Sequence, residues 1–201
     1  MPEAQTRRLA SQERRALLVE AAEETFATRG YTQAGLAEVA TLAGVSKTLL
    51  YHYFPDGRPE LYREVMDRLV SQVLDSVREA ARAPVPTGER LGRLVRALLG
   101  WFGEHPDAYR LLVLEPWGSG DTGVVAQATA VRARLAGELN TLLAPAGAPL
   151  QVTMAAGAAT LGAVLQVCEL RMSGQVGDAE AVDVAERFVR GGLAALDLLH
   201  D

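Results

Sequence analysis

A hydrophobic repeat of about 3.6 residues recurs through nearly the whole chain of 201 residues, and no stretch sustains the apolar and polar alternation of a half-buried strand. Leu18, Ala22 and Phe26 show this repeat in the first expected helix, residues 11–28, which Gly30 ends. A chain with this periodicity buries its apolar residues along helix faces. The sequence therefore predicts an all-α fold.

Prolines and glycines divide the rest of the chain into further helices. FPDGRP, residues 54–59, ends a pair of short helices, and APVPTG, residues 83–88, is the strongest later break. After the first helix we expect helices at residues 35–42, 46–53, 59–82, 87–104, 106–114, 121–143, 149–172 and 179–199.

Composition limits the compartment and the chemistry. Cys168 is the single cysteine, so an intrachain disulfide is impossible and no zinc-ligand spacing can be drawn, which favours a reducing cytoplasm. The N-terminus lacks the apolar stretch of a signal peptide. Residues 139–168 form an uncharged run longer than the roughly 20 residues that span a bilayer. Pro145 and Pro149 interrupt it, and its Ala and Gly content favours a buried soluble helix, with no membrane partner.

Residues 36–54, LAEVATLAGVSKTLLYHYF, have the spacing of a helix-turn-helix. The small Ala40 lets two helices approach, Gly44 can adopt the positive φ of a tight turn, and Leu50 closes the core beneath the second helix. Ser46 is expected to cap that second helix. The outer face of the helix then carries four polar side chains: Lys47, Thr48, Tyr51 and His52.

The motif G-V-S-K-x-x-L-Y-x-Y-F, residues 44–54, follows a helix that ends in F-A-x-R-G-Y. This combination resembles the DNA-binding domain of the TetR family of bacterial regulators. The resemblance implies a flexible arm at residues 1–11, a helix-turn-helix domain at 12–72, and a helical domain for effector binding and dimerisation at 73–201. It also implies a cytoplasmic homodimer that binds double-stranded operator DNA, as a repressor released by a small hydrophobic effector.

The same resemblance implies DNA contacts from the second motif helix and from an arginine after it: Ser46, Lys47, Thr48, Leu49, Tyr51, His52 and Arg58. The chain departs from the family pattern at nearby positions. Ala34 and Gly35 stand where a hydroxyl residue is usual, and Ala37 replaces a common basic residue. Gly57 falls where a phosphate-binding lysine is frequent, so we expect that role to pass to Arg58. Arg7, Arg8, Arg14 and Arg15 are candidates for extra backbone or minor-groove contacts.

A set of aromatic, aliphatic and sulfur-containing side chains could line an effector cavity, with His105 and Glu169 as the polar members. Its residues are Trp101, Phe102, His105, Tyr109, Val113, Trp117, Met154, Leu165, Cys168 and Glu169. Ordinary core packing explains any one of these residues equally well. Only the family resemblance favours a cavity.

Small and aliphatic residues form stripes on the last two expected helices, and we expect these stripes to build a four-helix dimer interface. The stripes comprise Ala155, Ala158, Gly162, Ala185, Val189, Gly192 and Leu196. An alternative function rests on GSGDTG, residues 118–123, whose glycines have the pattern of a dinucleotide-binding loop. That loop does not directly follow a strand, so we expect no enzyme, no cofactor and no metal site.

Overall fold

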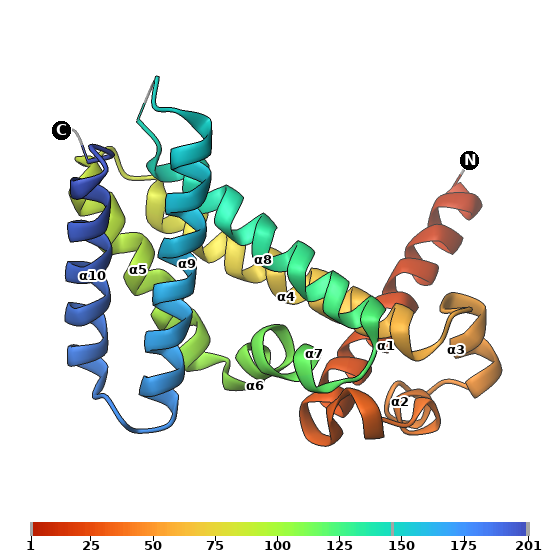
Figure 1. The fold of residues 1–201 in the computed structure, drawn as a ribbon. Helices are drawn as coiled ribbons and strands as arrows, with labels where there is room; N and C mark the ends of the chain where they lie inside the picture. Colours follow the sequence, from red (N-terminus) through yellow and green to blue (C-terminus); the bar gives the residue numbers. More distant parts are fainter. Residues whose placement is uncertain (1, 146, 200–201) are drawn as a thin grey trace. The chain divides into compact units, whose positions relative to one another are not determined.

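The computed structural model describes residues 2–145 and 147–199, with side chains described from residue 11 onward, and it confirms the all-α prediction: these residues contain helices and no strand. The helices are α1 (Pro2–Gln33), α2 (Leu36–Leu42), α3 (Lys47–Tyr53), α4 (Arg58–Ala81), α5 (Thr87–Glu104), α6 (Pro106–Tyr109), η1 (Arg110–Leu114), α7 (Glu115–Gly118), α8 (Thr122–Leu143), α9 (Leu150–Met172) and α10 (Asp178–Ala195) (Figure 1).

The predicted and observed helices differ in three places. α1 begins at Pro2 rather than near residue 11 and bends at Gly30, whose φ of 74° lies in the left-handed region. α10 ends at Ala195 rather than 199. The single helix expected at residues 106–114 is instead α6 followed by the π-helical turn η1 and by α7, which extends the helical segment to Gly118. Pro116 has no N–H to donate to a carbonyl four residues earlier, which favours irregular hydrogen bonding in this segment.

The chain forms two compact units, and each is built from two separate segments. The first runs to Leu69 and includes Asp107–Ala128, whereas the second contains Val70–Pro106 and the chain from Thr129 onward. The polypeptide therefore passes between the units three times: within α4, after the first residue of α6 and within α8. The domain division at residue 72 stays a prediction.

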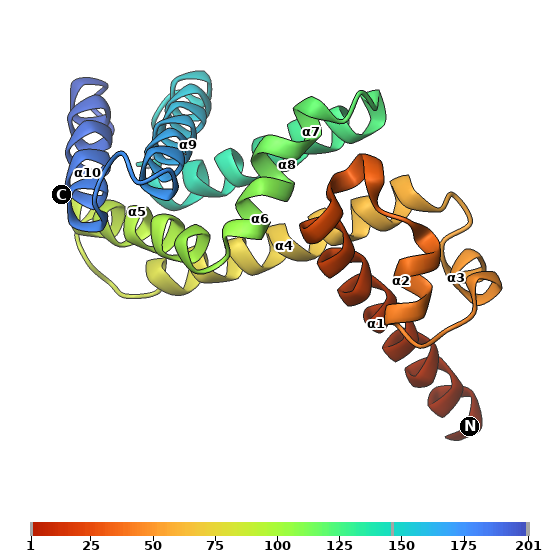
Figure 2. The same cartoon turned by 90° about the horizontal axis from the view of Figure 1, so that it is seen from below.

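In the first unit, α2 contacts α1 and α3 contacts α2 (Figure 2). The core below these helices is aromatic. The rings of Phe26 and Tyr31 each lie edge-on to Tyr62, at centroid distances of 5.0 and 4.9 Å. Leu50 and Phe54 complete the core from the α3 side with no exposed surface. The short helices are thus held by tertiary packing, since helices of seven residues are not stable alone.

In the second unit, α9 and α10 lie side by side and both contact α5 (Figure 1). α10 buries Ala181, Ala185, Val189 and Leu193, a stripe at intervals of four residues. α9 is long and apolar enough to cross a membrane, with a mean hydropathy of 1.4 over its most apolar window. It nevertheless packs against α5 and α10, and residues such as Val164 and Cys168 are buried.

Gly157 in α9 marks a close approach to α8. A Cβ atom at this position would lie 2.7 Å from the carbonyl oxygen of Ala136 and 3.2 Å from Cβ of Asn140. Real Cβ atoms do not approach backbone oxygens this closely, so an added methyl must push the two helices apart. Glycine at residue 157 therefore sets the spacing of these helices.

Gly157→Ala is expected to lower the free energy of unfolding by about 1–3 kcal/mol, because overpacking outweighs the gain in helix propensity. Gly137→Ala is the matched control in α8, since an added Cβ there has no atom within 4 Å. The control should gain up to about 1 kcal/mol. Urea unfolding of both variants measures the difference, and equal stability gains would contradict the close approach.

Candidate nucleic-acid interface

The helix-turn-helix has the geometry that the sequence predicts. Gly44 adopts a φ of 67°, and the Val45 N–H donates to the Ala40 carbonyl at 2.9 Å, which closes the turn. Ser46 caps α3, because its hydroxyl oxygen accepts a hydrogen bond from the Leu49 N–H at 3.2 Å. Ala40 and Leu50 are buried beneath the two helices. The roles expected for Gly44, Ser46 and Leu50 in the fold are confirmed.

The outer face of α3 is polar and accessible. Ser46, Lys47, Thr48, Tyr51 and His52 are exposed, whereas Leu49 is half-buried at the edge of the face. Lys47 Nζ lies 5.9 Å from the centroid of the Tyr51 ring, so a cation–π contact orients these two side chains together. α3 contains no acidic residue that would repel a phosphate. The face therefore presents a cation, hydroxyl groups and an imidazole on a rigid helix.

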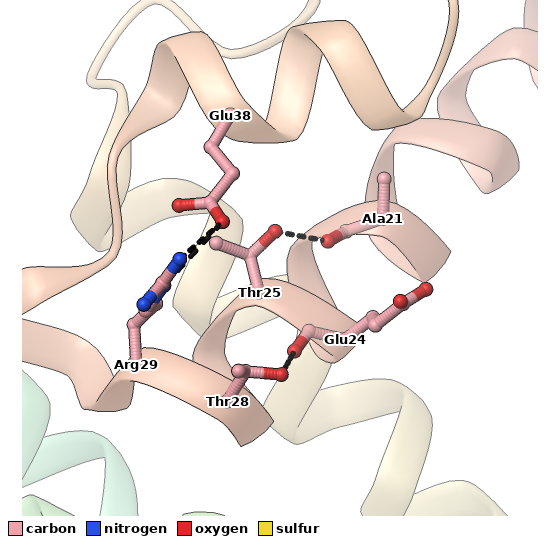
Figure 3. Close-up of polar contacts among 6 residues, drawn as sticks. All are labelled: Ala21, Glu24, Thr25, Thr28, Arg29 and Glu38. Atoms are coloured by element: carbon pink, nitrogen blue, oxygen red, sulfur yellow. Dashed lines mark hydrogen bonds and ion pairs between the residues drawn. The ribbon is translucent and has the colours of Figure 1, made fainter.

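An ion pair at the surface joins α2 to α1 (Figure 3). Arg29 Nη2 in α1 lies 3.3 Å from Glu38 Oε1 in α2, which ties the two helices together at the surface. The hydroxyls of Thr25 and Thr28 donate to the carbonyls of Ala21 and Glu24 in the preceding turn. These hydroxyls are therefore satisfied within α1, and Arg29 alone links the two helices in this view.

Arg58 does not project outward as the sequence suggested. Its Nη1 donates to the carbonyl of Thr32 at 2.9 Å, and its guanidinium lies 5.9 Å from the centroid of the Tyr31 ring. Gly57, with a φ of 69°, turns the chain so that α4 begins against α1. The guanidinium of Arg58 thus joins the start of α4 to the end of α1, and its contact with DNA stays a prediction.

The other arginine candidates also have partners within the chain. Arg15 pairs with Glu64 at 2.7 Å and lies 4.5 Å from the Phe54 ring centroid. Hydrogen bonds from Ser11 and then Arg14 lower the pKa of Tyr53. Arg7 and Arg8 lie outside the residues whose side chains are described. At the start of α2, Gly35 provides no side-chain cap, as its sequence implies.

The expected effector residues are distributed over both units. Trp101, Phe102 and His105 lie together, with the Trp101 and His105 rings stacked at 4.5 Å and the Phe102 ring edge-on to Trp101 at 5.3 Å. His105 also bonds through Nδ1 to the Trp101 carbonyl oxygen at 2.8 Å. Leu165 and Cys168 are buried in the same unit, and burial raises the pKa of the Cys168 thiol to about 11.

The remaining members of that set differ in burial and in the unit to which they belong. Tyr109 and Val113 are buried in the first unit. Trp117 and Met154 are 51% and 58% exposed, and Glu169 is also exposed. Trp117, Met154 and Glu169 are therefore surface residues of this chain, and their assignment to an effector cavity stays a prediction.

The dimer residues divide between two sides of their helices. Ala155, Ala158, Gly162, Gly192 and Leu196 are exposed, as a contact with a second subunit requires. Ala185 is fully buried inside the chain, so its assignment to a dimer contact is wrong. Val189 is also largely buried, but it borders the groove between α9 and α10, and its assignment stays a prediction.

The exposed side of α9 and α10 is more apolar than the stripes alone suggested. It also carries Phe188, which is 71% exposed, and Leu150, Met154 and Val184. Between the two helices lies a shallow groove of about 90 Å³, bordered by small residues including Ala159, Ala163 and Gly192. We define the α9–α10 face as the exposed small and apolar residues Ala155, Ala158, Gly162, Gly192 and Leu196 together with Leu150, Met154, Val184 and Phe188.

GSGDTG is a capped turn and not a dinucleotide site. Asp121 Oδ1 accepts hydrogen bonds from the N–H groups of Gly123 at 2.9 Å and Val124 at 3.2 Å, which caps α8. The segment before the loop is helical, and the part of the chain that the structure describes has no strand from which a dinucleotide-binding loop could extend. The alternative that this loop binds a nucleotide is not supported.

Sequence reasoning missed two residues that contact Tyr31. The Tyr31 hydroxyl donates to Asp121 Oδ2 at 2.6 Å, and the Tyr31 N–H donates to Glu115 Oε1 at 2.8 Å. Burial and then the bond to Asp121 raise the pKa of Tyr31 to about 12, while the same bond and two backbone N–H groups lower the pKa of Asp121. In the sequence, the only indication of these contacts was the acidic Asp121 in the glycine-rich loop of residues 118–123.

Comparison with known proteins agrees with this geometry. Residues 18–65 match the family described as "Bacterial regulatory proteins, tetR family", and this segment contains the whole helix-turn-helix. The transcriptional activator FasR of Mycolicibacterium smegmatis is 40% identical over 105 residues, which cover 52% of this chain and 48% of FasR. The chain thus aligns with about half the length of this relative.

Two solved structures share the fold over nearly the whole chain. The fatty acid degradation regulator FadR from Bacillus halodurans has a TM-score of 0.72 at 22% identity, with 89% of this chain and 98% of that chain covered. FadR from Bacillus subtilis in complex with stearoyl-CoA has a TM-score of 0.69 at 16% identity, with coverages of 92% and 97%. The match to residues 18–65 and its observed helix-turn-helix identify this segment as a DNA-binding domain of the TetR family of bacterial regulatory proteins, and the solved structures share the fold of the rest of the chain.

Proposed function

We propose that this protein is a cytoplasmic, homodimeric transcriptional regulator without catalytic activity, which binds double-stranded operator DNA through α3 and loses affinity for it when a small apolar effector binds. The outer face of α3 carries this proposal. Lys47, Thr48, Tyr51 and His52 stand exposed on a helix that a capped turn and a buried Leu50 hold in place. Such side chains contact phosphates and base edges when a recognition helix enters the major groove.

Lys47→Ala is expected to weaken operator binding and to reduce the salt dependence of binding by about one unit of slope per recognition helix, since one phosphate contact is lost. Fluorescence anisotropy with the DNA that flanks the protein's own gene, at several salt concentrations, measures both quantities. Arg82→Ala is the control, because it removes a highly exposed positive charge in the other unit. Equal losses in the two variants would reject the assignment.

Dimerisation through the α9–α10 face is the second part of the proposal. A helix-turn-helix protein reads two half-sites about 34 Å apart only when two recognition helices are joined. The exposed Phe188, Met154 and Leu150 are costly to leave in water, and the small residues beside them allow close helix approach. A second copy of the same face would bury these residues in a four-helix contact.

An acyl-CoA is the first effector to test, because one of the structural relatives was solved with stearoyl-CoA. Trp101 and Trp117 provide a fluorescence signal in each unit. We expect stearoyl-CoA to change this fluorescence and to bind more weakly when operator DNA is present. A tenfold loss of DNA affinity implies a tenfold loss of effector affinity, about 1.4 kcal/mol of coupling.

Titration of stearoyl-CoA with and without operator DNA measures that coupling, and free coenzyme A is the control for binding through the head group alone. Equal affinity in the two titrations would show that acyl-CoA binding does not control DNA release. The name of FasR describes an activator, so transcription from a reporter promoter then gives the sign of regulation.

A further inference from the structure

The end of α1 is held by hydrogen bonds from a segment more than 80 residues away in sequence. Glu115 accepts from the Tyr31 N–H at 2.8 Å, and Asp121 accepts from the Tyr31 hydroxyl at 2.6 Å. A third bond lies beside them, since the Tyr62 hydroxyl donates to the Leu111 carbonyl at 2.7 Å within the π-helical turn. We call Tyr31, Glu115 and Asp121 the Tyr31 clamp.

The backbone conformation of Gly30 allows Glu115 to bond to the N–H of Tyr31. Gly30 has a φ of 74° and is buried, and a Cβ atom there would collide with the Glu115 carboxylate. Glycine therefore permits the carboxylate to reach the N–H of the next residue. A carboxylate that accepts from a backbone N–H makes a strong, charge-assisted hydrogen bond.

The residues that receive the clamp also support the helix-turn-helix. The Gly30 carbonyl accepts from the Ala34 N–H at 3.1 Å, just before α2 begins. Arg29 pairs with Glu38 of α2, and Arg58 of α4 binds the Thr32 carbonyl. Residues 29–34 therefore carry bonds to α2 and α4 as well as to the segment 107–128.

The chain enters this segment from the second unit at both ends. Residue 107 follows Pro106, and residue 128 continues into the rest of α8, both of which belong to the second unit. A change in the second unit thus has a covalent path into the segment that holds Tyr31. α4 is a separate covalent path, because it crosses between units after Leu69.

We propose that the Tyr31 clamp couples the segment 107–128 to the DNA-binding helices, so that the state of this segment and the binding of DNA to α3 influence each other. Tyr31 and Asp121 are positioning residues, since they act through residues 29–34 and not by touching DNA. The inference rests on the proposed function. Because coupling is reciprocal, operator DNA must also stabilise residues 107–128.

Hydrogen exchange tests this coupling without any effector. In the wild-type protein, DNA flanking the protein's own gene is expected to slow exchange in α3 and to slow exchange by about fivefold or more in residues 107–128. In Tyr31→Phe the slowing in α3 should remain, whereas the slowing in residues 107–128 should decrease, because the bond to Asp121 is lost and the backbone bond to Glu115 is kept. Thermal unfolding and circular dichroism establish that the variant is folded.

Two further variants isolate the hydrogen bond. Asp121→Ser keeps a good cap for α8 while its short side chain leaves Tyr31 unbound, so it should behave like Tyr31→Phe. Thr28→Val is the control. It also removes a hydroxyl from α1, but this hydroxyl donates to the Glu24 carbonyl of the same helix, so the variant should behave like the wild type.

Each outcome has one meaning. Unchanged DNA-induced protection of residues 107–128 in Tyr31→Phe and Asp121→Ser would overturn the clamp, as would its absence from the wild type while α3 is protected. Absence of protection in α3 of the wild type would reject operator binding itself, and the inference would fall with it.

Discussion

Gly162→Arg is expected to convert the proposed dimer to a monomer and to abolish specific operator binding. Gly162 lies on the exposed side of α9, and a Cβ atom there has no atom of its own chain within 4 Å. The isolated chain can therefore accommodate arginine. In a four-helix contact the same side chain would bury an unpaired charge, at a cost of several kcal/mol, which is about the effect of breaking a buried ion pair.

Analytical ultracentrifugation measures the loss of dimer mass, and anisotropy measures the loss of DNA binding. Gly137→Arg is the matched control, because Gly137 is an exposed helical glycine in α8 with equally open surroundings. Phe188→Ser should weaken the dimer in the same way by removing exposed apolar surface. A fully dimeric Gly162→Arg protein would exclude the α9–α10 face as the subunit contact.

Leu50→Ala is expected to cost about 2–5 kcal/mol of the free energy of unfolding, as truncation of a fully buried leucine usually does. Leu50 has no exposed surface and lies where α3 meets the core of the first unit. A loss of this size is a large part of the stability of a typical domain. Operator binding should fall with it, because α3 loses its support.

Leu49→Ala distinguishes the loss of packing beneath α3 from the loss of a contact with DNA, since Leu49 is the residue before Leu50 and is only half-buried. It should cost much less stability than Leu50→Ala, while its effect on DNA binding reports the outer face of α3. Urea unfolding and anisotropy on both variants give the comparison. Similar losses of stability at residues 49 and 50 would contradict the observed orientation of α3.

Local patterns allowed much of the fold to be predicted. The periodicity gave most helix bounds within a few residues, and the turn at Gly44 and the cap at Ser46 depend on chemistry within a few residues of each position. The π-helical turn was not predicted, because hydrophobic periodicity reports neither the missing N–H of Pro116 nor the Tyr62 hydroxyl that binds the Leu111 carbonyl from 49 residues away. Periodicity describes one helix at a time and carries no information on such a partner.

The candidate sites were harder to predict for the same reason. Ala185 fitted an apolar stripe, but α10 has apolar residues on two sides, and only the packing against α9 shows which side is internal. The bond between Tyr31 and Asp121 joins residues 90 positions apart. Arg58 matched a phosphate-binding role by position, whereas the left-handed turn at Gly57 brings it to Thr32.

The division of the first compact unit into two stretches of sequence limits how this protein can be recombined with its relatives. A chimera that joins residues 2–69 to the remainder of another protein with this fold would bring Tyr31 and Tyr62 without Asp121 and Leu111, which belong to the second stretch. The hydroxyls of Tyr31 and Tyr62 would then lack these hydrogen-bond partners. The DNA-binding helices would have to be transferred together with residues 107–128, so a chimera of this fold requires two separate segments of sequence to be exchanged.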